Sequence, residues 1–316
     1  ALYALEGPPR WFDLRSPVKT FLTYGQLVKA LESVPAIKVA TWWETADPVW
    51  QASFRTGIPV YFIQDFETSY YDPTQHSERA RVVASYRKEF HALALSRWVQ
   101  GALAGVGVNA ELMPPWYDDH VFSPDPGVSR QRDVLLALGR SHPLKNFSMT
   151  VRAWEAMRPR PRLQLFGIEP DVATGLGGAQ YVLQPPDQEV ANLYRRATVF
   201  VQTSRHEGFG LPLLEAMACG CPVVCTDAVG NRDFCRDGEN CLVVSQDDVA
   251  ALARVLERLF ADPKLQERLQ RGGYETAAAY TRERLVPRLE NFYLRLGTRG
   301  APVGAFRSVG SASARS

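Results

Sequence analysis

Short apolar runs alternate with stretches of helical pattern along most of this chain. Runs rich in β-branched and aromatic residues predict strands, and their alternation with helices is typical of βαβ units around a parallel sheet. In the second half the predicted strands are residues 133–138, 162–166, 180–184, 199–203, 222–226 and 241–244, and the predicted helices are about 146–157, 187–197, 211–219 and 247–261. This half is expected to be a doubly wound α/β domain.

The first half shows the same alternation less regularly. Its predicted strands are residues 37–43, 58–66, 91–95 and 109–113, and its helices lie near 23–34, 78–90 and 96–104. The fold class is therefore α/β, with two Rossmann-like parallel-sheet domains. A chain of 316 residues is long enough for two domains that each bury a core.

A proline-rich segment separates the two halves. Residues 114–130 carry four prolines and one glycine, which neither a helix nor a central strand tolerates. We expect one domain at 1–120, a second at 131–280, a helix at 281–296 that packs back toward the first domain, and a disordered tail at 297–316. Because the chain begins at Ala1 without a methionine or a recognisable first strand, we expect the first domain to be incomplete.

Composition excludes several classes of protein. The net charge of +2 argues against nucleic-acid binding, which usually needs a clustered basic face. The most apolar stretch, residues 91–108, is interrupted by Arg97 and Gln100, so no segment reaches the roughly 18 apolar residues of a membrane span. A cytoplasmic protein is expected, and peripheral contact with an anionic membrane surface stays open.

The five cysteines all lie between residues 219 and 241. Their number is odd, and they contain no C-x-x-C pair and no clustered histidine, so the spacing favours neither a disulfide framework nor a zinc site. They are expected to be reduced, mostly buried thiols. No D-x-D sequence occurs, and His206-Glu207 lacks the second histidine of H-E-x-x-H, so we expect no metal and no cofactor.

The densest signal is the phrase VFVQTSRHEGFGLPLLEAMACGCPVVCTD, residues 199–227. A strand is followed by a loop that contains Gly208 and Gly210, and then by Pro212 in the first turn of a helix. The glycines let the backbone approach a ligand, and the free N–H groups of the helix point at it, which is typical of an anion site. A phosphate is the ligand expected here.

Two carboxylates flank this predicted phosphate site. Glu207 precedes the helix and Glu215 lies inside it, and both are acceptors suited to the hydroxyls of a sugar and a ribose. Spacing alone leaves two other interpretations open: Glu215 as a solvated helix residue beside a buried face, and Glu207 as a helix cap. A sugar, a diphosphate and a ribose together describe a nucleotide sugar.

The phrase resembles the family 4 retaining glycosyltransferases of GT-B fold. Their hallmark is a glutamate, seven residues and a second glutamate, matched by Glu207 and Glu215. The resemblance implies two Rossmann-like domains facing each other across a cleft, and a donor bound at Gly208, Phe209, Gly210, Leu211, Glu215 and Leu183. It runs from about residue 133 to 290, and Cys241 departs from it by replacing a common glycine.

A second phrase, LALGRSHPLKNF at residues 136–147, is similar to the family's segment after the first strand of the donor domain. The resemblance implies that Arg140 and Lys145 bind the donor diphosphate. The residue types fit, since a guanidinium fork and an ammonium can clamp phosphates and neutralise the charge of a leaving group. Two surface cations on a loop are the alternative.

The first half is expected to hold the acceptor, and its clearest phrase is YFIQDFE, residues 61–67. It is similar to bacterial rhamnosyltransferases that build surface glycans. Gln64, Asp65 and Glu67 could orient acceptor hydroxyls, with Asp65 the catalytic candidate, but a strand-end aspartate is as often a cap. The glycine-rich loop that the family carries after its first strand is not present in this sequence.

The predicted function is metal-independent transfer of a sugar, rhamnose as the first candidate, with retention of configuration. The expected partners are a nucleotide-sugar donor and a glycan or lipid-linked glycan acceptor, and the sequence does not predict an oligomeric state. Glu207, Arg140, Lys145 and Asp65 are the predicted catalytic residues. A nucleotide-sugar epimerase and an inactive sugar-nucleotide-binding subunit are the alternatives.

Overall fold

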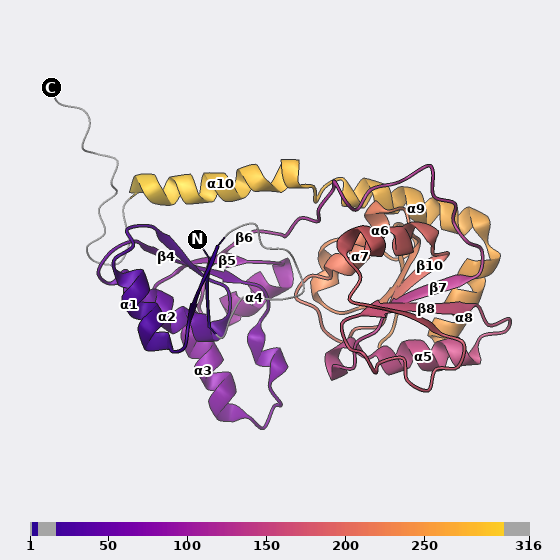
Figure 1. Cartoon of the computed structure of the whole chain (residues 1–316), viewed down its shortest axis with the longest axis horizontal. Helices are drawn as coiled ribbons and strands as arrows, with labels where there is room; N and C mark the ends of the chain where they lie inside the picture. Colours follow the sequence, from indigo (N-terminus) through magenta and orange to yellow (C-terminus); the bar gives the residue numbers. More distant parts are fainter. Residues whose placement is uncertain (1, 6–16, 300–316) are drawn as a thin grey trace. The chain divides into compact units, whose positions relative to one another are not determined.

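The structure is a computed structural model that describes residues 2–5 and 17–299. The chain divides into two compact units, one formed by Ala1–Pro114 with Val286–Ser316 and the other by Pro115–Leu285 (Figure 1). The predicted tail at 297–316 includes the last residues of a helix up to Arg299, and residues 300–316 lie outside the described part.

The proline-rich segment packs on the second unit. The guanidinium of Arg195 donates to the carbonyl oxygens of Val121 and Ser123 at 2.7 and 2.8 Å, and Arg130 donates to those of Ala197 and Gly220. The division therefore falls at Pro114, whereas the sequence placed the second domain from residue 131.

The second unit contains a parallel six-stranded sheet in the order β12-β11-β10-β7-β8-β9. In chain order the sheet runs from β7 outward through β8 and β9, and then returns to add β10, β11 and β12 on the other side, which is the doubly wound Rossmann arrangement. Its strands are β7 (Val134–Leu138), β8 (Arg162–Gly167), β9 (Gln180–Leu183), β10 (Val199–Gln202), β11 (Val223–Thr226) and β12 (Leu242–Val244).

Helices cover both faces of this sheet, so its central strands are buried continuously (Figure 1). On one face α5 and α8 pack against Leu135, Leu165 and Val201. On the other face Tyr194 of α6 contacts Phe166 and Phe200 with ring centroids 5.7 and 5.0 Å apart. The helices are α5 (Phe147–Ala156), α6 (Asp187–Arg196), α7 (Leu211–Ala218), α8 (Val249–Ala261) and α9 (Pro263–Ala277).

The first unit contains a parallel sheet in the order β3-β4-β5-β6 and a separate parallel pair, β1-β2. Helices α1 to α4 supply the apolar side chains that pack on one face of the larger sheet. Its elements are β1 (Leu2–Leu5), β2 (Val18–Phe21), α1 (Tyr24–Glu32), β3 (Ile37–Ala40), α2 (Trp43–Ser53), β4 (Ile58–Ile63), α3 (His76–Tyr86), β5 (His91–Ala94), α4 (Arg97–Gly105), β6 (Ala110–Leu112) and α10 (Arg282–Arg299).

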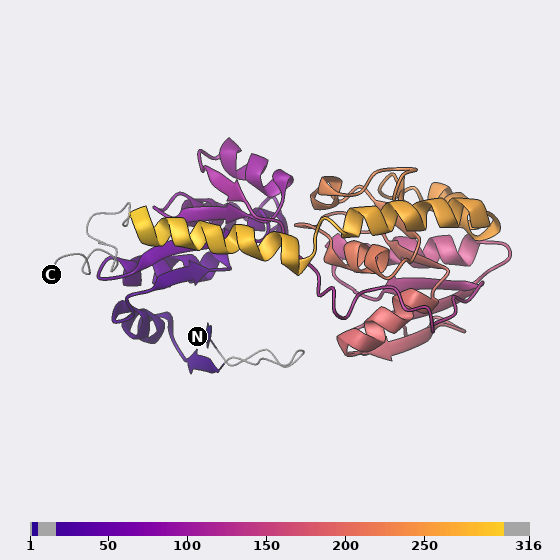
Figure 2. The same ribbon diagram turned by 90° about the horizontal axis from the view of Figure 1, so that it is seen from above.

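Helix α10 returns to the first unit and covers the other face of that sheet (Figure 2). Phe292 and Leu296 pack against Val60 and Leu93, and Arg295 pairs with Glu111 at 2.7 Å. The last helix of the sequence therefore completes the core of the first unit.

Helix α2 differs from the sequence prediction, which continued the strand at 37–43. The strand β3 ends at Ala40, and α2 begins at Trp43. The hydroxyl of Thr45 accepts from the backbone N–H of Trp42 at 3.2 Å, and this capping contact starts a helix despite the two tryptophans and the internal Pro48.

Among the described residues, no helix combines the length and the apolar content needed to cross a membrane.

Candidate active site

The two loops predicted to bind the donor follow strands β7 and β10, which are neighbours in the second sheet. The direction of winding reverses between these two strands, and ligands of doubly wound sheets bind outside the carboxyl ends of the strands at this point. Lys145 follows β7 and Glu207 follows β10. The topology therefore places both residues where such a sheet binds its ligand.

Lys145 and Glu207 are in direct contact. The Lys145 ammonium donates to Glu207 Oε1 at 2.8 Å and to Oε2 at 2.9 Å. The Glu207 side chain is only 11% exposed, whereas that of Lys145 is 30% exposed. A cation and a carboxylate predicted from two separate phrases thus form one pair at the switch point of the sheet.

Two residues that the sequence analysis did not single out hold the Glu207 carboxylate. Gln202 Nε2 and the Ser204 hydroxyl both donate to Glu207 Oε1, at 2.8 and 2.7 Å. Together with Lys145 they give Oε1 three donors, so Oε2 is the oxygen with acceptor capacity left for a ligand hydroxyl. The signal that could have found them is a polar residue at the carboxyl end of a buried, central strand.

Direct hydrogen bonds join the two loops. The backbone N–H of Arg205 donates to the carbonyl of Leu144 at 2.8 Å, and the Thr203 hydroxyl donates to the carbonyl of Asn146 at 2.9 Å. Asn146 has a positive φ of 48°, a left-handed conformation that asparagine adopts more readily than most residues. These bonds fix Lys145 relative to Glu207 through the backbone.

The segment Gly208–Leu211 leads into α7. Gly210 has a φ of 105°, which a residue with a side chain adopts only under strain, and α7 begins at the next residue with Pro212 in its first turn. The first N–H groups of α7 have no partner within the helix and can bind an anion. Leu211 is half-buried at the start of α7, whereas the Phe209 side chain is buried against Phe234 and Tyr280. Only the backbone of Phe209 is therefore available to a ligand.

Gly230 supports this segment from the loop after β11. A Cβ atom at this position would lie 2.3 Å from the carbonyl oxygens of both Glu207 and Gly208. The backbone N–H of Gly230 donates to the Glu207 carbonyl at 3.1 Å, and the N–H of Glu207 donates to Ala228. Glycine is required here because the two backbones touch.

Glu215 lies inside α7 and is half-buried. Burial raises the pKa of its carboxyl to about 7, with the charge of Asp187 acting in the same direction and Tyr194 opposing it. Glu215 therefore does not behave as a solvated helix residue, and it can both donate and accept a hydrogen bond near neutral pH.

We expect the raised pKa of Glu215 to appear in the pH dependence of stability. The folded chain keeps this proton up to about pH 7, and the unfolded chain loses it near the ordinary pKa of 4.5, so the free energy of unfolding should fall as pH rises between these values. The loss is on the order of 3 kcal/mol at most. Urea unfolding of the wild type and Glu215→Gln at several pH values checks this, and parallel pH profiles of the two proteins would contradict it.

Arg140 occupies the same loop as Lys145 but makes a different contact. Its Nε lies 3.1 Å from Glu169 Oε1, as an ion pair without hydrogen-bond alignment. A hydrogen bond from Ser141 and the Arg140 charge lower the pKa of Glu169. Arg140 also lines a cavity of about 640 Å³ whose other polar residues include Arg152, Arg205 and His142. The structure thus pairs Arg140 with Glu169 and not with Glu207.

Leu183 ends the edge strand β9 and is 48% exposed. It lies at the carboxyl end of its strand, and its backbone contact to a nucleotide base stays a prediction. The next residue, Gln184, has a positive φ of 49°, and its N–H donates to the carbonyl of Gly167 at 2.7 Å. Gln184 therefore stays hydrogen-bonded to the end of β8 while its backbone leaves the extended conformation of the strand.

Asp65 belongs to the first unit, at the end of β4, and is 4% exposed. Its Oδ1 accepts from the N–H of the next residue, Phe66, at 2.7 Å. The N-cap of the short helix Glu67–Tyr70 is Phe66 itself, so this bond is not the capping role that the sequence left open. Glu67 is 1% exposed and accepts from Tyr61 at 3.0 Å, and burial raises its pKa to about 8. The expectation that Glu67 orients acceptor hydroxyls was wrong, because this carboxyl packs inside the core.

The comparison with family models concerns the second unit. Residues 122–276 match the family "Glycosyl transferases group 1". The matched range includes the whole six-stranded sheet and the loops that carry Arg140, Lys145 and Glu207. It covers slightly less than half of the chain.

Curated relatives and solved structures agree with this match. The chain is 37% identical over 199 residues to a D-inositol 3-phosphate glycosyltransferase of Frankia alni, which involves 54% of this chain and 49% of that protein. It is 31% identical over 172 residues to the O-antigen chain mannosyltransferase B of Escherichia coli, involving 50% of this chain and 45% of that one. The chain therefore spans about half the length of these relatives.

The fold is similar to that of HepE of Anabaena, crystallised in complex with UDP-glucose. The TM-score is 0.77 at 20% identity, and the match covers 89% of this chain and 86% of HepE. Sucrose-phosphate synthase from Thermosynechococcus elongatus gives a TM-score of 0.74 at 21% identity and covers 86% of this chain and 78% of that one. These matches establish a GT-B type α/β fold for the chain.

Proposed function

We propose that this chain is a retaining glycosyltransferase of family 4, which transfers a sugar from a nucleotide-sugar donor to a glycan or lipid-linked glycan acceptor. The observation that carries the proposal is the Lys145–Glu207 pair, at 2.8 Å, beside the start of α7 at the switch point of a Rossmann sheet. The match of residues 122–276 to group 1 glycosyl transferases supports it independently.

In this proposal the donor diphosphate lies on the backbone N–H groups of Gly208–Leu211. The charge that grows on the departing diphosphate would be neutralised by the Lys145 ammonium, which is partly exposed, and by Arg140 once it exchanges Glu169 for phosphate oxygens. Protein cations would thus do the work for which other glycosyltransferases use a metal ion held by a D-x-D sequence, and transfer should proceed without added Mg²⁺.

The two glutamates would hold the ends of the donor. Glu207 Oε2, which keeps acceptor capacity, would accept from a hydroxyl of the transferred sugar. Glu215 would bind the ribose. Because Glu207 already accepts from Lys145, Gln202 and Ser204, it is arranged to position the sugar and not to attack it, unlike the nucleophilic carboxylate of retaining hydrolases.

The proposal names the class of enzyme, and the donor sugar and the acceptor are to be identified by experiment. Rhamnose is the first donor sugar to test because of the phrase at residues 61–67, while the relatives named above are a D-inositol 3-phosphate glycosyltransferase and a mannosyltransferase. GDP-mannose and UDP-linked sugars therefore belong in the same panel. Asp65 is proposed as a positioning residue on the acceptor side, because its buried carboxylate accepts from the N–H of Phe66 after β4.

The proposal is tested by a donor panel followed by product analysis. The nucleotide sugar that binds should raise the midpoint of thermal unfolding in proportion to the logarithm of its concentration over its dissociation constant. With an acceptor, the product should carry the anomeric configuration of the donor, as read by NMR. Conversion of the donor without an acceptor would indicate an epimerase, and tight binding without turnover across the acceptor panel would indicate an inactive binding subunit.

A further inference from the structure

Three of the five cysteines meet in the second unit although their spacing does not predict a metal site. Cys225 lies in β11, Cys235 follows the turn Gly230–Asp233, and Cys241 immediately precedes β12. Their sulfur atoms all lie within 4.8 Å of one another. Among the residues that the structure describes, this is the one group of three or more His, Cys, Asp or Glu side chains close enough to share a metal ion.

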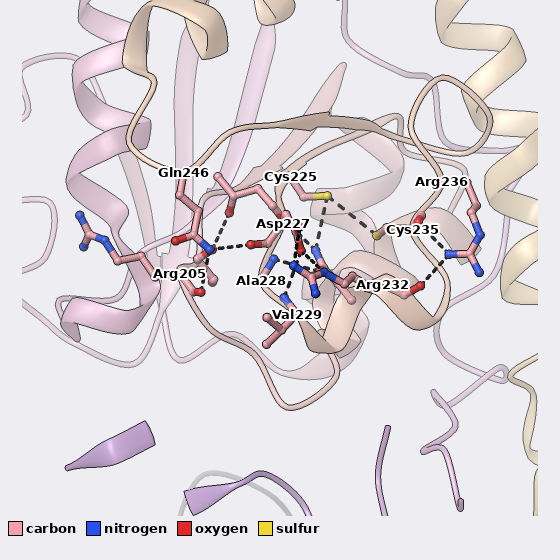
Figure 3. Close-up of polar contacts among 12 residues, drawn as sticks. Arg205, Cys225, Asp227, Ala228, Val229, Arg232, Cys235, Arg236 and Gln246 are labelled. Carbon is pink, nitrogen blue, oxygen red and sulfur yellow. Dashed lines mark hydrogen bonds and ion pairs between the residues drawn. The ribbon is translucent and has the colours of Figure 1, made fainter. Parts of the chain in front are cut away.

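The sulfur positions fit a single ion. Cys225 Sγ and Cys235 Sγ are 3.8 Å apart and point toward each other (Figure 3). Thiolates bound at about 2.3 Å around one tetrahedral ion are separated by about 3.8 Å. The third sulfur, that of Cys241, lies within 4.8 Å of both, at most about 1 Å beyond this separation.

The surroundings suit thiolate ligands. Cys225 and Cys241 are 1% and 0% exposed, and Cys235 is half-buried, so the group lies largely out of contact with solvent. Asn231 Nδ2 lies 3.6 Å from Cys225 Sγ and can donate to it. The guanidinium of Arg236 donates to the carbonyl of Cys235 at 2.9 Å and so fixes the backbone beside the group (Figure 3). The charges of Asp227 and Asp237 disfavour ionisation of the neighbouring Cys225 and Cys241 thiols, whereas hydrogen-bond donors such as Asn231 stabilise the ionised form that metals bind.

We propose that Cys225, Cys235 and Cys241 bind one thiophilic d¹⁰ cation, Zn²⁺ or Cu⁺, as a structural site. Binding would replace the thiol protons by the ion and release them to solvent. Three sulfurs suffice for trigonal Cu⁺, and Zn²⁺ would add one water as the fourth ligand. The site departs from the expectation, based on spacing, that these residues are ordinary buried thiols.

The position of the cluster gives the ion a structural role. The segment between Cys225 and Cys235 contains Ala228 and Gly230, whose backbone holds Glu207. An ion bound to the three sulfurs would close the chain from residue 225 to 241 into a loop fixed to two neighbouring strands, β11 and β12. It would stabilise the loop behind the donor segment without touching the substrate, so it does not depend on the proposed function.

The test titrates the reduced full chain separately with Zn²⁺ and Cu⁺. We expect one ion per chain, release of protons, a higher midpoint of thermal unfolding, and thiolate-to-metal charge-transfer absorption when Cd²⁺ is the probe. Cys235→Ala should weaken affinity by more than about 100-fold, beyond the 10- to 100-fold typical of losing an outer-shell partner. X-ray absorption of the bound ion distinguishes the two metals, since three sulfurs alone fit Cu⁺ and an added oxygen ligand fits Zn²⁺.

Cys219→Ala is the matched control, because Cys219 is a buried cysteine of the same unit outside the cluster. It should leave metal affinity unchanged, and comparing the two variants without metal separates a folding defect from a lost ligand. Undiminished affinity in a folded Cys235→Ala, or no binding of either ion by the reduced chain, would overturn the proposal. Finding a Cys225–Cys235 disulfide in place of bound metal would replace the site with a redox pair.

Discussion

Replacing Lys145 by alanine is expected to lower the rate of sugar transfer by about 10²–10³ while the chain stays folded. The ammonium contacts both carboxylate oxygens of Glu207, and it is the partly exposed member of this pair, so it can turn to the diphosphate of a bound donor. Its loss would remove charge neutralisation of the leaving group. Initial rates under saturating donor, with circular dichroism as the check on folding, measure the effect.

Lys264→Ala is the matched control, since Lys264 is an exposed lysine of the same unit on α9. It should leave transfer at the wild-type rate.

Glu207→Gln keeps the shape of the side chain but removes its charge, and it should lower the transfer rate to a degree similar to Lys145→Ala. If Lys145→Ala keeps more than about a third of the wild-type rate, the ammonium has no role in leaving-group departure.

Replacing Gly230 by alanine should lower the rate of sugar transfer nearly as much as Lys145→Ala, although Gly230 itself touches no substrate in the proposal. The Cβ atom of Gly230→Ala would lie 2.3 Å from the carbonyl oxygens of Glu207 and Gly208, and both of these are backbone atoms that cannot turn aside. We expect a loss of about 1–3 kcal/mol in the free energy of unfolding. A displacement of Glu207 by about 1 Å would lower transfer by about 10²-fold.

Gly177→Ala provides the comparison for this change. Gly177 lies in the same unit and needs no positive φ, and a Cβ atom added there would meet no other atom within 4 Å. Its replacement should therefore alter neither stability nor transfer measurably. Wild-type donor affinity and turnover in a folded Gly230→Ala would show that the loop after β11 does not position Glu207.

The sequence predicted the second unit well because its signals are local. The strands there are buried apolar runs, and Gly210 and Pro212 mark the start of the helix at Leu211 within three residues. The sequence predicted Lys145 and Glu207 for one donor site, from two separate phrases, and both lie at the carboxyl ends of neighbouring strands. The ion pair between them was not predicted.

Other features depend on contacts between residues far apart in sequence. Gln202 and Ser204 gain their role only when β10 brings them to Glu207, and the three cysteines meet only because β11 and β12 are neighbours. Helix α2 was missed because its tryptophans and Pro48 disfavour a helix locally, while packing in the first unit stabilises one. Arg140 was predicted to bind phosphate, and no pattern in the sequence indicated its ion pair with Glu169.

The most direct test of the central claim is a crystal structure of the chain with the nucleotide sugar that gives the largest thermal shift. We predict a diphosphate on the backbone N–H groups of Gly208–Leu211, with the Lys145 ammonium about 2.7–3.2 Å from a phosphate oxygen and Glu207 on a sugar hydroxyl. A donor bound elsewhere, with Lys145 and Glu207 contacting only each other, would contradict the proposal.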